Sequence, residues 1–262
     1  MASKSHKRYH VDEFNSKMHL DVYFSQTTHQ AMQEVAIRYP IMQLHKSVTS
    51  GRIKGDTLID VSMGPLVHLL CTVSDVFKEI TILKFNDECI KEVKKWLDTH
   101  TECFDWSHTS KYITELNEGG SQIQEMEEEL KSKIKHIMKC DIEKENITDP
   151  VILPKSDCLL SVTVLEGISE DQEEFGKNLK KIVSLLKPGG QLLLFTALDA
   201  TFYQLGEHKF KLLKCDETFV RSVLCEQGFV IEYIDWLKKP SETHLTDFND
   251  VTFIIARKPM EV

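Results

Sequence analysis

Residues 58–65, LIDVSMGP, have the residue types of a turn that could hold a ligand. An apolar stretch ends in a carboxylate, Asp60, and Gly64 and Pro65 precede a second apolar stretch. In nucleotide-type α/β folds, a strand that turns sharply into a helix brings backbone N–H groups close to a cofactor. Such turns usually carry two or three glycines, whereas Ser62 and Met63 stand here. The sequence therefore predicts a ligand-binding turn with altered residues.

The composition indicates one globular domain over residues 1–262. Of the 262 residues, 41% are hydrophobic and 28% are charged, and the net charge is −9. These values are typical of soluble proteins and give no basic groove for nucleic acid. No apolar run approaches the ~20 residues that cross a bilayer, and the N-terminus lacks the apolar core of a secretion signal. We expect a protein of the cytosol that acts as a monomer.

Cysteine and histidine give no metal-binding signal. The seven cysteines contain no CxxC pair, and the 11 histidines contain no HExxH pattern. We therefore expect reduced thiols that lie mostly in the core, and no metal site. His29, His45 and His68 are interpreted as surface or packing residues.

The hydrophobic pattern of the first half predicts helices before and between strands. Helical spacing over 14–24 and 28–48, with a kink or break at Pro40, indicates a helical lid over residues 1–50 ahead of a core over 51–262. Apolar strands are predicted in 55–63 and 79–85, with a helix between them. A helix over 87–100 follows, for which Asp87 is a candidate N-cap, and a third strand is predicted in 110–116.

The second half of the sequence predicts further alternation of helices and strands. An amphipathic helix is expected over 121–142, because Ile123, Met126, Leu130, Ile134 and Ile137 form one apolar stripe. A loop, a strand in 156–165 and a helix over 171–186 follow. A tight reversal at 188–190 leads into a strand to 198, then a helix over 216–229 and strands in 230–237 and 250–258. The pattern predicts an α/β, Rossmann-like, doubly wound, mostly parallel seven-stranded sheet with an antiparallel terminal hairpin.

Several motifs in this order carry a more specific resemblance. They are KGDTLIDVSMGP, FDWS, KCDI, SLLKPGGQLLL, GEHKF and the closing ARK. With them the sequence resembles the class I S-adenosylmethionine-dependent methyltransferase family that contains the nicotinamide, indolethylamine and phenylethanolamine N-methyltransferases and thioether S-methyltransferase. The resemblance covers nearly the whole chain. It implies S-adenosylmethionine as cofactor, a small amine or thioether as methyl acceptor, and in-line transfer without a metal or a covalent enzyme intermediate.

The resemblance also implies which positions face the cofactor. Asp60, Gly64 and Pro65 match the family's turn around the methionine end of the cofactor, while Ser62 and Met63 replace small residues. Lys84 stands where the family has an acid that accepts both ribose hydroxyls, and an ammonium cannot accept hydrogen bonds.

Four further positions follow from the same resemblance. Cys89 stands where the family has an asparagine, and Asp87 could replace the lost acid or could only cap its helix. Asp141 and Ile142 match the segment that packs around the adenine and binds its amine.

Five positions match the acceptor side of the family. His19 and Phe24 stand at two tyrosines of the lid, Thr196 stands at an aspartate that orients nicotinamide, Ala200 stands at a serine, and Tyr203 matches a retained tyrosine. Because the groups that would bind a carboxamide are mostly absent, nicotinamide is not an expected substrate.

Two functional hypotheses remain open. One is an active methyltransferase for a small amine or related nucleophile. The other is a catalytically impaired relative that binds the cofactor weakly or not at all and acts as an interaction protein. Two lost charge-assisted hydrogen bonds, at roughly 1.5–3 kcal/mol each, would weaken cofactor binding by about 100- to 10,000-fold.

Overall fold

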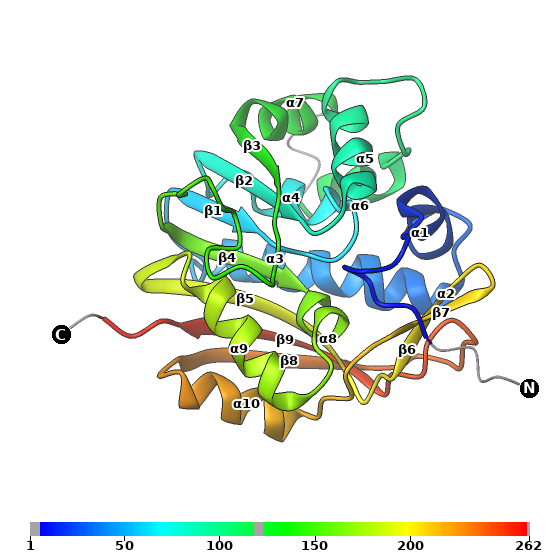
Figure 1. Cartoon of the computed structure of the whole chain (residues 1–262). Coiled ribbons are helices and arrows are strands. Elements are labelled where there is room, and N and C mark those ends of the chain that lie inside the picture. Colours follow the sequence, from blue (N-terminus) through cyan, green and yellow to red (C-terminus); the bar gives the residue numbers. More distant parts are fainter. Residues whose placement is uncertain (1–5, 118–122, 261–262) are drawn as a thin grey trace, which may run out of the picture.

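A seven-stranded sheet forms the centre of the computed structural model, which describes residues 6–117 and 123–260 (Figure 1). In spatial order the strands are β3 (Ile134–Lys139), β2 (Glu79–Lys84), β1 (Thr57–Asp60), β4 (Ser156–Val162), β5 (Leu186–Leu198), β9 (Asp250–Arg257) and β8 (Val230–Lys238). The first five run parallel, and β9 and β8 pair antiparallel. The predicted fold class is confirmed.

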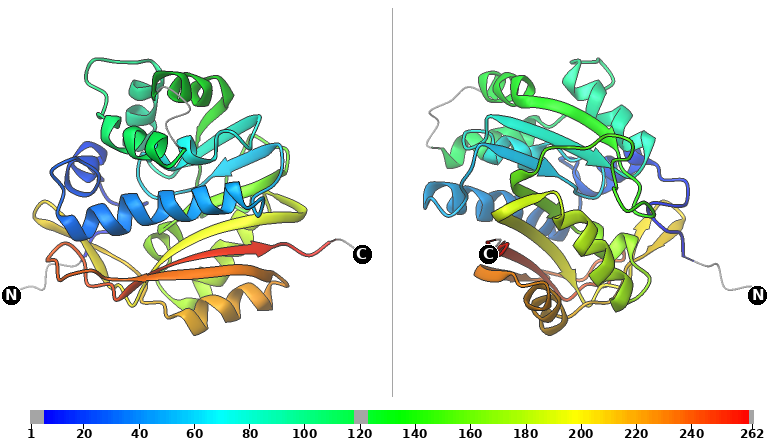
Figure 2. Two further views of the ribbon diagram at one scale, coloured as in Figure 1. Left: turned by 180° about the vertical axis from the view of Figure 1, so that it is seen from behind. Right: turned by 60° about the vertical axis from the view of Figure 1, so that its left-hand side comes forward.

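Helices cover both faces of this sheet. The views in Figures 1 and 2 place α3 on one face and α9 on the other. The helical segments are α1 (Ser16–Tyr23), α2 (Gln30–Met32), a π-helical stretch (Gln33–Arg38), α3 (Tyr39–Thr49), α4 (His68–Val73), α5 (Asp87–Leu97), α6 (Ser107–Leu116), α7 (Ile123–Lys133), α8 (Val164–Ile168), α9 (Gln172–Val183) and α10 (Glu217–Glu226). A separate hairpin joins β6 (Phe202–Leu205) to β7 (His208–Lys211).

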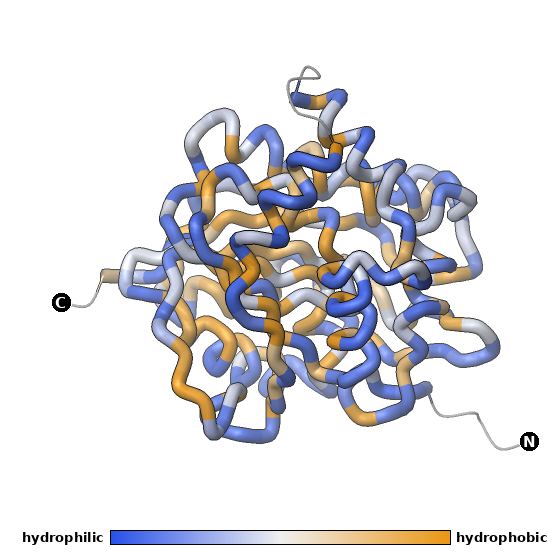
Figure 3. The backbone as a smooth tube through the Cα atoms, turned by 90° about the horizontal axis from the view of Figure 1, so that it is seen from above, coloured by the Kyte–Doolittle hydropathy of each residue, from blue (hydrophilic) through white to orange (hydrophobic). Residues whose placement is uncertain are grey.

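The core forms where the sequence is continuously apolar. Strands β4, β5 and β9 are buried along most of their length, because helices pack on both faces of a parallel sheet. Figure 3 shows hydrophobic stretches running through the middle of the molecule and hydrophilic ones around it. Short polar side chains cap the N-termini of α9 and α10. Asp171 accepts a hydrogen bond from the Glu174 N–H, and Asp216 accepts one from the Phe219 N–H.

Two predicted elements are wrong. Residues 110–116, predicted as the third strand, belong to helix α6, in which Ile113 is buried on one face. The third strand is instead β3, in the second half of the helix predicted over 121–142, and α7 ends at Lys133. Pairing with β2 overrides the helical spacing of Ile134 and Ile137. Residues 121 and 122 of that prediction lie outside the described residues.

Smaller differences concern element ends. Asn86, not Asp87, caps α5, since its side chain accepts from the Cys89 N–H. The reversal predicted at 188–190 lies within β5 as a register shift, with Gly189 at φ +73°. Pro40 directly follows the π-helical stretch, and the helical backbone runs on through it from residue 30 to residue 49, so the chain does not break there. Helix α8 and the β6–β7 hairpin were not predicted.

All seven cysteines are free thiols, and five of them are buried. Within residues 6–117 and 123–260, no helix is long and apolar enough to cross a membrane. The same residues hold no group of three or more metal-ligating side chains.

Candidate active site

The chemistry-bearing residues collect at the carboxyl ends of the parallel strands. Asp60 ends β1 and Lys84 ends β2, while α8 and the last residues of β5 follow the same edge. In open α/β sheets, ligands bind at this edge. A ligand-binding site is therefore expected at this edge of the sheet.

Lys84 and Asp60 form a buried ion pair. The Lys84 Nζ lies 2.7 Å from Asp60 Oδ2, and the two side chains are 0% and 2% exposed. The same ammonium donates to the backbone oxygen of Ser62 at 3.0 Å, and the Ser62 N–H donates to Asp60 Oδ1 at 3.2 Å. The turn is thus held together by the residue that replaces the expected acid.

Strand register produces this pairing. Asp60 lies opposite Ile82 in the parallel β1–β2 ladder. Lys84 is two residues beyond Ile82, so its side chain leaves the sheet on the same face as that of Asp60. The long lysine side chain then reaches back to the carboxylate across the strand ends.

The N-terminal segment closes the turn from the outside. Tyr9 is fully buried, and its hydroxyl accepts from the Gly64 N–H at 3.0 Å and lies 3.7 Å from Cys89 Sγ. The backbone of Lys7 pairs with Lys209 and Lys211 of β7, which holds this segment in place. Burial raises the pKa of the Tyr9 hydroxyl far above its usual range. Sequence reasoning missed Tyr9, because no periodic pattern marks its segment.

Met63 packs into the core. Its side chain is 4% exposed, and its Cε lies 2.3 Å from where a Cβ on Gly167 would stand. A larger residue than glycine at 167 would therefore displace the methionine. Pro65 and the Ser62 side chain are also buried, and the Ser62 hydroxyl has no hydrogen-bond partner among the described residues.

Three of the positions expected to face the nucleoside line an outer hollow of about 490 Å³, whereas Lys84 and Cys89 do not. Asp87, Asp141 and Ile142 border it, together with Phe85 and His10. Asp87 is exposed and forms an ion pair with Lys139, and Asp141 accepts from the Glu143 N–H. Cys89 is fully buried, and this burial raises the pKa of its thiol to about 12.

An apolar cavity of about 120 Å³ lies on the inner side of the turn. His19, Phe24, Met63, Phe195, Tyr203 and Phe248 are among the residues that line it. Three of them, His19, Phe24 and Tyr203, belong to the predicted acceptor side. The turn residue Met63 forms part of the same wall, so the cavity adjoins the turn.

The other two predicted acceptor residues do not line this cavity. Phe195 and Ala197 do, and Thr196 between them points to the opposite face of β5 because strand side chains alternate. The Thr196 hydroxyl is buried and unpartnered within the described residues. Ala200 is fully buried beyond the end of the strand.

Two polar groups in the cavity wall lack partners. Within the described chain, nothing binds the buried His19 Nδ1 or the Tyr203 hydroxyl. Burial, and then the charge of Lys84, lower the pKa of His19 to about 3, so its imidazole is neutral at pH 7. Burial also raises the pKa of Tyr203 well above 10. The cavity therefore offers neutral hydrogen-bonding groups in an aromatic wall.

Glu166 lies behind this wall and does not line the cavity itself. Its Oε1 accepts from the N–H of the lining residue Ala197 at 2.9 Å, and its buried Oε2 has no partner among the described residues. Burial raises the pKa of this carboxyl to about 7. Sequence reasoning missed Glu166, although its place just after β4, at the carboxyl edge of the sheet, was a usable signal.

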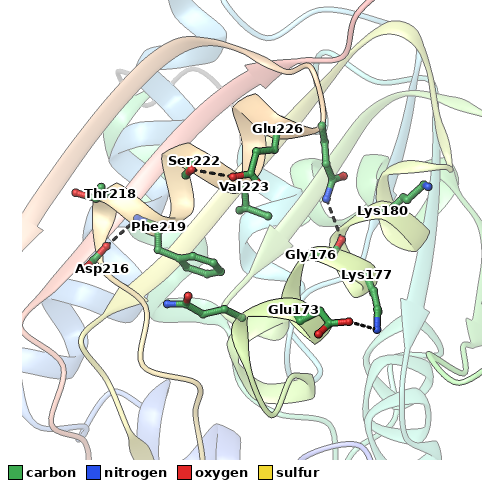
Figure 4. A pocket seen from close by; sticks show the side chains of 12 residues that line it. Glu173, Gly176, Lys177, Lys180, Asp216, Thr218, Phe219, Ser222, Val223 and Glu226 are labelled. Atoms are coloured by element: carbon green, nitrogen blue, oxygen red, sulfur yellow. Dashed lines mark hydrogen bonds and ion pairs between the residues drawn. The ribbon is translucent and has the colours of Figure 1, made fainter.

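A larger hollow of about 800 Å³ lies between α9 and α10, away from the strand ends (Figure 4). Its polar groups largely satisfy one another: Glu173 pairs with Lys177, and the Ser222 hydroxyl donates to Glu226. This groove offers an ordinary charged helix surface and no catalytic arrangement.

Comparison with known proteins places this chain in a family. The model of the NNMT/PNMT/TEMT family matches residues 3–259. The chain is 29% identical to nicotinamide N-methyltransferase of Homo sapiens over 249 residues, which is 95% of this chain and 94% of the relative. It is 31% identical to phenylethanolamine N-methyltransferase of Mus musculus over 217 residues, which is 81% and 73% of the two chains.

Solved structures agree on the fold. The N-methyltransferase NodS from Bradyrhizobium japonicum, in complex with S-adenosylhomocysteine, superposes with a TM-score of 0.55 at 13% identity, over 94% of this chain and all of that one. Magnesium protoporphyrin IX methyltransferase from Synechocystis, with bound S-adenosylmethionine, gives 0.56 at 11% identity, over 92% and 90%. With its family match over nearly the whole length, the chain belongs to the NNMT/PNMT/TEMT family of S-adenosylmethionine-dependent methyltransferases.

Proposed function

We propose that this protein transfers a methyl group from S-adenosylmethionine to the nitrogen of a small, mostly apolar amine. The observation that carries the proposal is the aromatic cavity beside the turn. The Glu166 carboxyl lies behind its wall, bound to the N–H of the lining residue Ala197. A cavity of about 150 Å³ holds benzene, so this one of about 120 Å³ suits a single ring or a short alkyl chain.

The unpartnered groups favour a nitrogen over a thioether. Glu166 Oε2 can only accept a hydrogen bond when ionised, and the His19 Nδ1 accepts one when the other ring nitrogen carries the proton. An amine supplies N–H donors for such groups, whereas a thioether supplies none. Leaving buried acceptors unpaired costs affinity, so an amine is the better match.

The cofactor fits one end of the site and not the other. The outer hollow at Asp141 and Ile142 has room and an acceptor for an adenosine group. At the turn, both oxygens of Asp60 already accept hydrogen bonds, and the Gly64 N–H is bound by Tyr9. A ligand at the turn must displace Tyr9 and lie beside a buried ammonium.

The acceptor-side residues can still prepare the nucleophile. When bound, S-adenosylmethionine supplies a methyl carbon on a sulfonium sulfur. Burial raises the pKa of the Glu166 carboxyl to about 7. We propose that its ionised form takes a proton from a protonated amine, which frees the nitrogen lone pair. Phe24, Phe195 and Phe248 exclude water from that nitrogen.

A second candidate function rests on the ion pair. Lys84 and Asp60 satisfy each other where the family resemblance places cofactor contacts. That observation favours a protein that keeps the fold but binds the cofactor weakly. The buried free thiols suit a reducing compartment, so we place either form in the cytosol, as a monomer.

The test combines binding with transfer. Calorimetric titration with S-adenosylhomocysteine measures the nucleoside site, and mass spectrometry measures transfer of a deuterated methyl group to a panel of single-ring amines and matched thioethers. We expect amine products, a loss of about 10²–10⁴-fold in rate for Glu166→Gln, and a rate within twofold of wild type for Glu173→Gln on exposed α9.

Two results decide between the candidates. Binding without any methylated amine would overturn the proposal and leave the second candidate. An unchanged rate for Glu166→Gln would overturn the role of that carboxyl.

A further inference from the structure

Met63 connects the turn after β1 with the apolar cavity. Its side chain is buried and lines the cavity. Its N–H donates to the Val162 backbone oxygen at 3.0 Å, and Val162 lines the same cavity from the end of β4. The conformation of this methionine side chain therefore helps to set the shape of the cavity.

Gly167 leaves room for the end of that side chain. Strand β4 lies beside β1, so α8, which follows β4, comes next to the turn that follows β1. A Cβ on Gly167 would lie 2.3 Å from the Met63 Cε, which is closer than two carbon atoms pack. The same Cβ would lie 3.8 Å from Leu212 Cδ2 and 3.8 Å from Tyr9 Cβ, which are ordinary contacts. Of these three neighbours, only the Met63 methyl would have to move.

The open space next to this methyl is the cavity. Leu212 and Tyr9, the other neighbours of Gly167, are buried, and protein interiors are close-packed with few voids. The cavity, in contrast, offers about 120 Å³. Leu212 and Met63 both line it, so the space beside Gly167 adjoins the cavity. A side chain at position 167 would therefore push the methionine methyl into the cavity.

We infer that Met63 and Gly167 together set the size of the acceptor and restrict it to amines with a single ring. The inference rests on the proposed function, since it takes this cavity as the acceptor site. Glycine at 167 keeps the methyl out of the space for the first ring, and the rest of the methionine side chain fills space that a second fused ring would need. One methylene more or less in an apolar pocket changes discrimination by about 10- to 200-fold. These two residues can therefore decide between one-ring and two-ring amines.

The experiment compares two aromatic amines that differ by one fused ring. Aniline and 1-naphthylamine are each titrated calorimetrically into wild type, Met63→Ala, Gly167→Ala and the variant with both substitutions. Transfer of a deuterated methyl group to the same amines is measured in parallel. The binding measurement does not depend on transfer, so it tests the cavity by itself.

Two control variants carry the same substitutions away from the cavity. Gly176 is also helical, and a Cβ added to it would lie 3.6 Å from Val223 Cγ2, an ordinary contact. Met126 is buried in α7 and does not line the cavity. We expect Gly176→Ala and Met126→Ala to leave both affinities within twofold of wild type.

The two test substitutions should act in opposite directions. Wild type should favour aniline, and Met63→Ala, which removes the Cγ, Sδ and Cε atoms, should shift the ratio of affinities about tenfold or more toward 1-naphthylamine. Gly167→Ala should weaken aniline binding about tenfold or more, because the displaced methyl fills part of the cavity. In the Met63→Ala background that loss should disappear, since no methyl remains to be displaced. If Met63→Ala does not fold, as judged by circular dichroism, Met63→Val also lacks Sδ and Cε and must shift the ratio in the same direction.

The possible failures are distinguishable. A wild type that favours 1-naphthylamine, an unchanged ratio in Met63→Ala, or a loss in Gly167→Ala that persists in the double variant overturns the inference and leaves the proposed function standing. Ratios that shift as expected without any methylated amine uphold the size limit of the cavity and overturn the proposed function. If neither amine binds any of these proteins at millimolar concentration, the inference and the proposed function fall together.

Discussion

Removing one partner of the Lys84–Asp60 pair tests the central electrostatic feature of the fold. The two atoms lie 2.7 Å apart in side chains that are 0% and 2% exposed. At an effective dielectric constant of about 20, their attraction is about 6 kcal/mol, and desolvation of both ions offsets most of it. Asp60→Asn leaves the ammonium buried without its counter-ion, so we expect a loss of about 3–5 kcal/mol.

The double variant separates pairing from packing. Asp60→Asn combined with Lys84→Met removes both charges, and we expect it to regain most of the stability lost in Asp60→Asn, to within about 1–2 kcal/mol of wild type. Urea unfolding followed by circular dichroism gives these free energies. The loss in Asp60→Asn corresponds to a decrease in melting temperature of roughly 6–20 °C.

Two outcomes would refute this reasoning. One is an Asp60→Asn protein within about 1 kcal/mol of wild type, a loss typical of an exposed pair. The other is a double variant as unstable as the sum of its single variants, which would mean that the two side chains are not coupled.

Three further predictions concern the cavity and the turn. The pKa of Glu166 rises from 4.5 to about 7 on folding, so the free energy of unfolding falls as pH increases from 4.5 to 7. Urea unfolding should show a loss of about 3 kcal/mol over that pH range. The Glu166→Gln variant should not show this loss. His68 is buried against Trp106, and burial lowers its pKa to about 3, so the free energy of unfolding falls as pH decreases below 6.5. In urea unfolding at several pH values, His68→Phe should reduce this pH dependence by up to about 1.4 kcal/mol per pH unit. Gly64 has φ +71°, and an added Cβ would lie 2.5 Å from the His19 ring; Gly64→Ala should cost about 1–2 kcal/mol or more, and a melting temperature equal to that of wild type would contradict this.

The sequence predicted most strands of the central sheet, because these strands are apolar and bounded by turn residues. Asp60, Gly64 and Lys84 could be placed at one edge, since carboxyl ends of parallel strands meet there. Strand β3 was missed because Ile134 and Ile137 fit a helical spacing equally well. Only pairing with β2 decides between the two structures.

The sequence predicted where the site residues lie along the chain, but it did not predict which atoms they contact. Lys84 was expected at the position of an acid that binds the ribose, and the structure shows its ammonium donating to Asp60 and to the Ser62 carbonyl. Tyr9 comes from a segment with no pattern of its own and meets the turn only through tertiary packing. Glu166 depends on burial for its raised pKa, and burial of a single acid cannot be derived from local sequence.

The self-contained ion pair also affects how the amount of folded protein responds to metabolism. A ligand that binds only the folded chain adds stability in proportion to the logarithm of its concentration over its dissociation constant. With its own charges paired, the turn leaves neither Asp60 nor Lys84 as an unpaired buried ion when no ligand is bound. We therefore expect the chain to fold when methyl donor is scarce, and a bound ligand adds only the stability set by its concentration and its dissociation constant.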